Sequence, residues 1–174
     1  MPASGDAMPA QAQAFLPPRR IERAFGRVLV LLVRLGLVRG HFYVLEVRGR
    51  KSGRTLALPV DVLDFAGRRY LVCARGEANW VRNARAAGEI ALVRALRRER
   101  WRVREPAEAE KPPILKAYLD RFAAEVQRFF PVPRGSPAEA FAELAPRYPV
   151  FELRRHTEDH TSGRSPSASI SGRK

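Results

Sequence analysis

The sequence has little cysteine, histidine and lysine, and it has no long apolar run. The single cysteine, Cys73, cannot form a disulfide within the chain, so a disulfide-based fold is excluded and a reducing cytoplasm is compatible. His41, His156 and His160 are not spaced as metal ligands or as partners of a catalytic nucleophile, so we predict no metal site. No apolar stretch reaches the roughly 20 residues of a membrane span.

Arginine is abundant where lysine is scarce. Four lysines among 32 basic residues leave 28 arginines, and the formal net charge is +14. Such a charge suits nucleic acid, anionic lipid or a phosphorylated cofactor. The arginines are spread over every segment rather than clustered among aromatic platforms, so we expect no nucleic-acid partner. The first residues lack the basic start and apolar run of a secretory signal, and we expect a cytoplasmic location.

Composition divides the chain into three parts. Residues 1–18 are rich in Ala, Pro and Gln and predict a flexible segment, whereas residues 156–174 are rich in Ser, Gly and Arg and predict a disordered basic tail. Between them we expect one domain over residues 19–155. Apolar residues at helical spacing predict that it begins with a helix at 19–38. This helix packs on the domain or, alternatively, lies on an anionic membrane surface with its arginines toward the headgroups.

The rest of the domain alternates short strands with helices. From β-branched and aromatic runs, strands are predicted at residues 42–47, 56–65, 70–74, 90–95, 100–104 and 149–153. From caps, prolines and helical spacing, helices are predicted at residues 79–87, 114–130 and 136–144. Antiparallel hairpins interrupted by helices predict an α+β fold, most simply a small barrel.

The turn at residues 49–54, Gly-Arg-Lys-Ser-Gly-Arg, lies between two predicted strands. Its two glycines allow a tight backbone that exposes amides, and Arg50, Lys51 and Arg54 surround those amides with positive charge. Ser52 adds a hydroxyl, so the turn suits a phosphate or carboxylate. The spacing is not that of a Walker loop, and no helix follows. The competing interpretation is a solvated basic hairpin turn.

A second segment, residues 74–83, joins a predicted strand to a helix that Asn79 is expected to cap. Helix N-termini attract anions. Trp80 and Asn83 are three residues apart and therefore share a helical face, where Trp80 could border a flat ring and Asn83 could bond to it. In the competing interpretation Trp80 fills the core and Asn83 lies at the surface.

The ordered set of these segments resembles the deazaflavin-dependent nitroreductase family, also called deazaflavin-dependent quinone reductases. The resemblance covers residues 42–104 and extends more loosely to residue 153. It rests on the turn at 49–54, on Leu58-Pro59-Val60, on Trp80-Val81-Arg82-Asn83 and on the stretch 145–151. One departure is the short loop before Trp80, where many members have a longer one and where Glu77 adds a negative charge.

The resemblance implies a split β-barrel of mostly antiparallel strands with an N-terminal helix and flanking helices, related to proteins that bind flavin mononucleotide (FMN). Many members of the family bind coenzyme F(420), a deazaflavin whose tail carries a phosphate and glutamates. The implied contacts are Arg50, Lys51, Ser52, Gly53 and Arg54 at the tail, Pro59 and Val60 beside the ring, Ala74, Arg75 and Gly76 at its polar edge, and Asn79, Trp80 and Asn83 completing the pocket.

The function implied by the resemblance is hydride transfer from the reduced deazaflavin to a quinone, a nitro compound or an activated enone. A proton would come from solvent or from a tyrosine, for which Tyr148 and Tyr118 are candidates. FMN is the alternative cofactor, because its single phosphate could also use the basic turn. A non-catalytic protein that carries a cofactor or lipid at the membrane surface is the alternative function. The resemblance also makes a homodimer an expectation.

Overall fold

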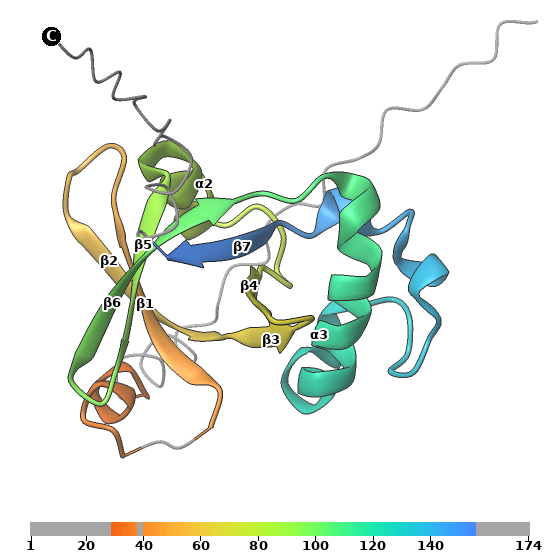
Figure 1. Ribbon diagram of the computed structural model, residues 1–174, viewed down its shortest axis with the longest axis horizontal. Helices are drawn as coiled ribbons and strands as arrows, with labels where there is room; N and C mark the ends of the chain where they lie inside the picture. The colour runs from red at the N-terminus through yellow and green to blue at the C-terminus, as the bar shows by residue number, and fades with distance from the viewer. Residues whose placement is uncertain (1–28, 38–39, 156–174) are drawn as a thin grey trace, which may run out of the picture.

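The computed structural model describes residues 29–37 and 40–155. Their seven strands form one curled sheet in the order β2-β1-β5-β6-β7-β4-β3, in which all neighbours are antiparallel (Figure 1). The strands are β1 (Phe42–Arg48), β2 (Thr55–Asp61), β3 (Leu63–Phe65), β4 (Arg68–Val72), β5 (Glu89–Arg94), β6 (Arg97–Arg104) and β7 (Val150–Arg155). This half-barrel with flanking helices confirms the predicted α+β split barrel.

Helices close the half-barrel and cover the sheet. Figure 1 shows α2 near the end of the half-barrel where β5 begins, and α3 standing beside β3 and β4. The helices are α2 (Asn79–Ala87) and α3 (Lys111–Val126), and the 3₁₀ turns are η1 (Glu108–Glu110), η2 (Gln127–Phe129), η3 (Ala138–Phe141) and η4 (Ala145–Arg147). Of the helix predicted at 19–38, residues 29–34 are helical, and much of the remainder lies outside the described residues, as do segments 1–18 and 156–174. None of the helices in the described ranges has both the length and the apolar character of a membrane span.

Strand alternation builds separate cores on the two faces of the sheet. Leu45 and Val47 of β1 point into the half-barrel, where they join a cluster that includes both tryptophans. The residues that alternate with them face outward, where they are polar or pack in a second apolar layer. On the outer face, Tyr118 and Phe122 of α3 cover β3 and β4 together with Tyr148. A third, smaller cluster places residues 29–33 against the outer face of β1 and β5.

Three sequence-based boundaries were wrong. The strand predicted at 56–65 is two strands, because the chain bends at Val62, whose N–H donates to the carbonyl of His41 (3.2 Å). Asn79 does not cap α2: it is the first helical residue, and Ala78 occupies the cap position without a side-chain bond. Residues 136–144 form no α-helix but contain the 3₁₀ turn η3, preceded by Pro137.

Other boundaries were wrong by a few residues, with the element type unchanged. The helix predicted at 114–130 is α3, and it starts at Lys111 rather than at residue 114. Prolines lie in its first turn, where their missing N–H groups would have no helical acceptor anyway. The β5–β6 hairpin is longer than predicted, because Ala95 and Leu96 alone form the turn at φ values of 47° and 64°. Gly88 ends α2 in the left-handed conformation at φ 67°, as predicted.

Candidate functional site

The turn between β1 and β2 is closed by its own backbone. The Gly49 N–H donates to the Arg54 carbonyl (2.9 Å), and the Gly53 N–H donates to the Gly49 carbonyl (2.8 Å). Gly53 adopts φ 67°, and a Cβ on Gly49 would lie 2.8 Å from Ser52 Oγ and 3.0 Å from the Arg54 carbonyl. Only glycine fits both positions without rearrangement, so the two glycines fix the shape of the turn.

This turn leaves donors available to a ligand. Ser52 Oγ accepts a hydrogen bond from the Arg54 N–H (3.3 Å). The backbone N–H groups of Lys51 and Ser52 donate to no acceptor in the described part of the chain. Lys51 and Arg54 are exposed beside them. Two amides, a hydroxyl and two cations at one turn form a donor set that matches a phosphate or carboxylate.

The turn and α2 meet directly, as the sequence analysis requires. Asn83 Oδ1 accepts two hydrogen bonds from Arg50, one from the backbone N–H (3.3 Å) and one from Nη1 (2.9 Å). Asn83 is only 6% exposed, so the alternative that it is a surface residue is wrong. The contact joins residues 33 apart in sequence and holds the Arg50 guanidinium against the helix.

Two hollows flank the turn. The larger, of about 870 Å³, extends from the turn over the outer face of β1, β5 and β6 and contains Arg48, Arg98 and Arg100. The smaller, of about 460 Å³, extends toward β2 and the start of α2, where Asn79 lines it. Both are lined by turn residues 49–52 and by Asn83. The larger hollow could not be anticipated from any motif, although the alternation of β6 places Arg98 and Arg100 on one face.

Trp80 lies in the half-barrel core rather than at the wall of either hollow. It is 7% exposed and packs in the half-barrel core, with its ring centroid 5.8 Å from that of Phe151. Among the described residues, the linings of the two hollows do not include it. Pro59 and Val60 are half-buried in β2, and Val60 packs against the same core. Contacts of these three residues with a ring remain a prediction.

The loop that enters α2 is short, and its negative charge is balanced by arginines. The Arg75 guanidinium lies 4.7 Å from the centroid of the Phe129 ring. The adjoining residues Ala74 and Gly76 are half-buried and buried, respectively. Glu77 pairs with Arg85 (2.6 Å) and with Arg82 (3.8 Å), so the negative charge that sets this loop apart is balanced within the chain.

The two candidate proton donors lie in the α3 core. The Tyr148 O–H donates to the Phe129 carbonyl (2.6 Å), and burial raises the pKa of this phenol. Burial also raises the pKa of Tyr118 well above its ordinary value. Within the described chain, neither tyrosine lines the hollows beside the turn. Their positions favour the interpretation as core residues, and a role in proton transfer remains a prediction.

A half-buried polar pair that no sequence motif indicated lies at the other end of β1 and β2. His41 Nε2 and Asp61 Oδ1 lie 3.3 Å apart. Burial, with the charge of Glu125, raises the pKa of Asp61 to about 6, and burial lowers the pKa of His41. The predicted hairpin could have indicated the proximity, because Phe42 pairs with Asp61 across the two strands. The described residues hold no cluster of three or more potential metal ligands.

Comparison with known proteins gives structural matches alone. No protein-family model matches the sequence. No curated protein matches it either. Solved structures that resemble the chain include an F(420)-H2 dependent reductase (17% identity, covering 66% of this chain and 94% of that one, TM-score 0.46). A domain-swapped dimer is also similar (15% identity, covering 77% of this chain and 96% of that one, TM-score 0.49). So is an FAD-binding protein from Mesorhizobium loti (10% identity, covering 72% of this chain and 86% of that one, TM-score 0.43). At these identities, residue roles do not carry over from one protein to another.

Proposed function

We propose that this protein is an oxidoreductase that binds the reduced deazaflavin coenzyme F(420), with the acidic tail of the cofactor at the turn of residues 49–54. The observation that carries the proposal is the contact of Arg50 with Asn83, which joins the turn to α2 at the edge of two hollows. A phosphate and glutamate carboxylates require several donors close together, and this junction supplies amides, a hydroxyl and cations.

The charge around the turn supports an anionic ligand of more than one group. Arg48, Arg98 and Arg100 continue the positive charge of the turn across the larger hollow. Glu46 and Glu89 are the acidic residues that line it among the described residues, and Glu46 is already bonded to Arg98 (2.9 Å) and Arg34 (2.5 Å). A tail with a phosphate and several carboxylates therefore meets a surface with cations along its path.

When bound, the deazaflavin supplies hydride transfer, here to a quinone, a nitro compound or an activated enone. The chain contributes binding and orientation. Lys51, Ser52 and Arg54 hold the tail, and Pro59 and Val60 of β2 border the ring. The packed half-barrel core behind β2 excludes water from that side. We propose that the proton comes from solvent, because both Tyr118 and Tyr148 are buried in the α3 core.

FMN is the second candidate, favoured by the fact that a single phosphate also matches this donor set. Titration of the purified protein with each cofactor, followed by tryptophan fluorescence, distinguishes the two. We expect saturable quenching by F(420) and weaker quenching by FMN. Tight binding of FMN without binding of F(420) would contradict the cofactor assignment. Binding of neither would contradict the proposed function. If F(420) binds, hydride transfer is tested by mixing the reduced complex with a soluble quinone.

A further inference from the structure

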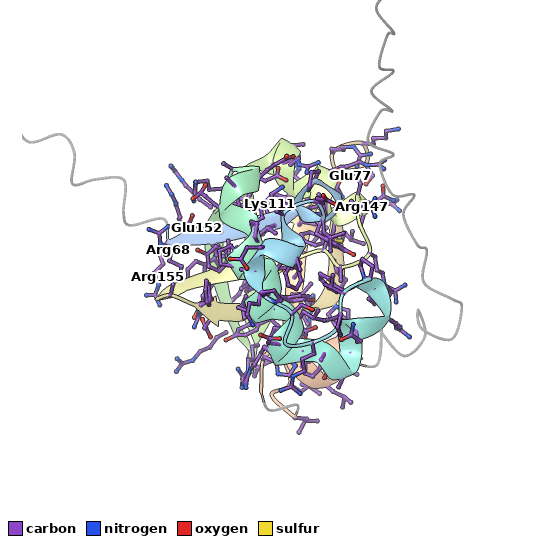
Figure 2. All side chains as sticks on the ribbon, turned by 90° about the vertical axis from the view of Figure 1, so that its right-hand side faces the viewer. Arg68, Glu77, Lys111, Arg147, Glu152 and Arg155 are labelled. Carbon is purple, nitrogen blue, oxygen red and sulfur yellow. The ribbon has the colours of Figure 1, made fainter. Side chains whose placement is uncertain are left out.

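A separate basic hollow, of about 540 Å³, lies at the end of β7. The pairing of β4 with β7 ends at Arg69 and Leu153, whereas β7 continues beside β6 through Arg154 and Arg155. The hollow is lined there by four arginines and one glutamate: Arg68, Arg69, Arg154, Arg155 and Glu152. Figure 2 shows Arg68, Glu152 and Arg155 together at one edge of the molecule.

Trp101 brings a buried donor to the wall of this hollow. It lines the hollow, is 5% exposed, and its Nε1–H has no hydrogen-bond acceptor among the described residues. The guanidinium carbons of Arg69 and Arg155 lie 5.3 Å and 5.5 Å from the centre of its ring. A buried N–H without an acceptor is costly and rare in folded proteins. Its position beside several cations points to an acceptor that carries negative charge.

Among the described residues that line the hollow, Glu152 is the one carboxylate, and it does not neutralise four arginines, although Arg69 also pairs with Asp64 (3.1 Å) and Glu99 (3.8 Å) beside the hollow. Glu152 accepts hydrogen bonds from Arg104 (2.7 Å), Arg154 (3.2 Å) and Arg68 (3.5 Å). Burial alone would raise the pKa of Glu152, but the bonds from Arg104 and Arg154 hold it below its ordinary value. Glu152 is therefore ionised and shared among several cations. The Arg68 and Arg154 side chains are still 57% and 48% exposed, so they keep donors toward solvent.

We propose that this hollow binds a phosphate group, carried either by a soluble phosphorylated molecule or by an anionic lipid headgroup. Guanidinium groups match phosphate oxygens in pairs, and phosphate has enough oxygens for both the arginines and the indole N–H. The site shares no lining residue with the hollows at the turn of residues 49–54, so it is independent of the proposed cofactor site.

The chain has two tryptophans, so a ¹H–¹⁵N spectrum carries two indole N–H signals, which through-bond experiments assign without a variant. Addition of pyrophosphate should shift the Trp101 signal saturably and leave the Trp80 signal in place. Arg68→Gln with Arg154→Gln should weaken this binding about tenfold, because charged hydrogen bonds to the ligand are lost. The matched control, Arg134→Gln with Arg147→Gln, removes the same charge from exposed positions elsewhere and should retain the wild-type affinity.

Lys51→Ala, which acts at the turn, should leave the Trp101 titration unchanged even if it abolishes cofactor binding. Vesicles of phosphatidylglycerol in phosphatidylcholine identify the source of the phosphate. Sedimentation with these vesicles that pyrophosphate reverses indicates a lipid headgroup, and its absence alongside saturable pyrophosphate binding indicates a soluble molecule. The proposal would be overturned by a Trp101 signal that pyrophosphate does not shift, by an equal loss of pyrophosphate affinity in the control variant, or by a response to duplex DNA alone.

Discussion

The hairpin of β1 and β2 has two ends of opposite character. At the turn end, Lys51, Ser52 and Arg54 are exposed, and donors face solvent. At the other end, the side chains of His41 and Asp61 are 26% and 14% exposed, and the ring centroids of His41 and of Phe122 in α3 lie 4.6 Å apart. The same pair of strands therefore presents exposed donors at one end and a half-buried polar pair at the other. Substitutions at the two ends should separate ligand affinity from stability.

The largest effect is expected at the closed end. Phe122 is 1% exposed, contacts both His41 and Tyr118, and fills the space between α3 and the sheet. Phe122→Ala leaves a cavity and should lower the free energy of unfolding by about 3–5 kcal/mol, measured by chemical denaturation. The affinity of the remaining folded protein for its cofactor should stay at the wild-type value. A loss of affinity without a loss of stability would contradict the division between the two ends.

A smaller effect, which depends on pH, is expected for Asp61→Asn. Burial raises the pKa of Asp61 from 3.8 to about 6, so Asp61 holds its proton more tightly in the folded protein than in the unfolded chain. Stability from this group is full below pH 3.8 and is lost as the pH rises through about 6. Such a rise in pKa corresponds to about 3 kcal/mol.

Because asparagine stays neutral, the variant should be more stable than the wild type above about pH 7 by up to that amount. The difference should disappear in acid. Thermal melts of both proteins across this range provide the measurement, and the wild type serves as the reference because His41 titrates in each. A variant that is less stable than the wild type at neutral pH would show that the ionised Asp61 contributes a favourable contact with His41.

Glycine substitution in the turn should have a smaller effect on stability. Gly53→Ala forces alanine into φ 67°, which costs about 1 kcal/mol. Gly67, at φ 72° in the β3–β4 turn, is a matched control because a Cβ there meets nothing within 4 Å. We expect both variants to lose similar stability by denaturation, but only Gly53→Ala to weaken cofactor binding. Equal cofactor affinity in the two variants would show that the shape of the 49–54 turn is not required.

Local patterns predicted much of the fold and part of the site. Gly49 and Gly53 between two alternating strands were sufficient to predict the first hairpin and its basic turn. The break at Val62 could not be read from the sequence, because it depends on a bond to His41 from a different segment. The same holds for Asn83. Its helical face was predicted, whereas its bonds to Arg50 require the curvature of the sheet to bring α2 over the turn.

Trp80 shows the limit of a resemblance. The spacing places Trp80 and Asn83 on one helical face, but that face spans both the core and its rim. In the structure Trp80 contacts the half-barrel core and Asn83 contacts the turn. The arginines around Trp101 went unnoticed because two lie in β4 and two in β7, far apart in sequence, and only the sheet order brings β4, β6 and β7 together.

The central claim is that the turn of residues 49–54 and α2 together hold one anionic-tailed cofactor. The most direct test is a titration of F(420) into the wild type, Lys51→Ala, Asn83→Ala and the control Lys116→Ala, whose lysine pairs with Asp120 on α3. We expect losses of about 1.5–3 kcal/mol of binding free energy for Lys51→Ala, a clear loss for Asn83→Ala and none for the control. Equal affinities in all four proteins would contradict the account.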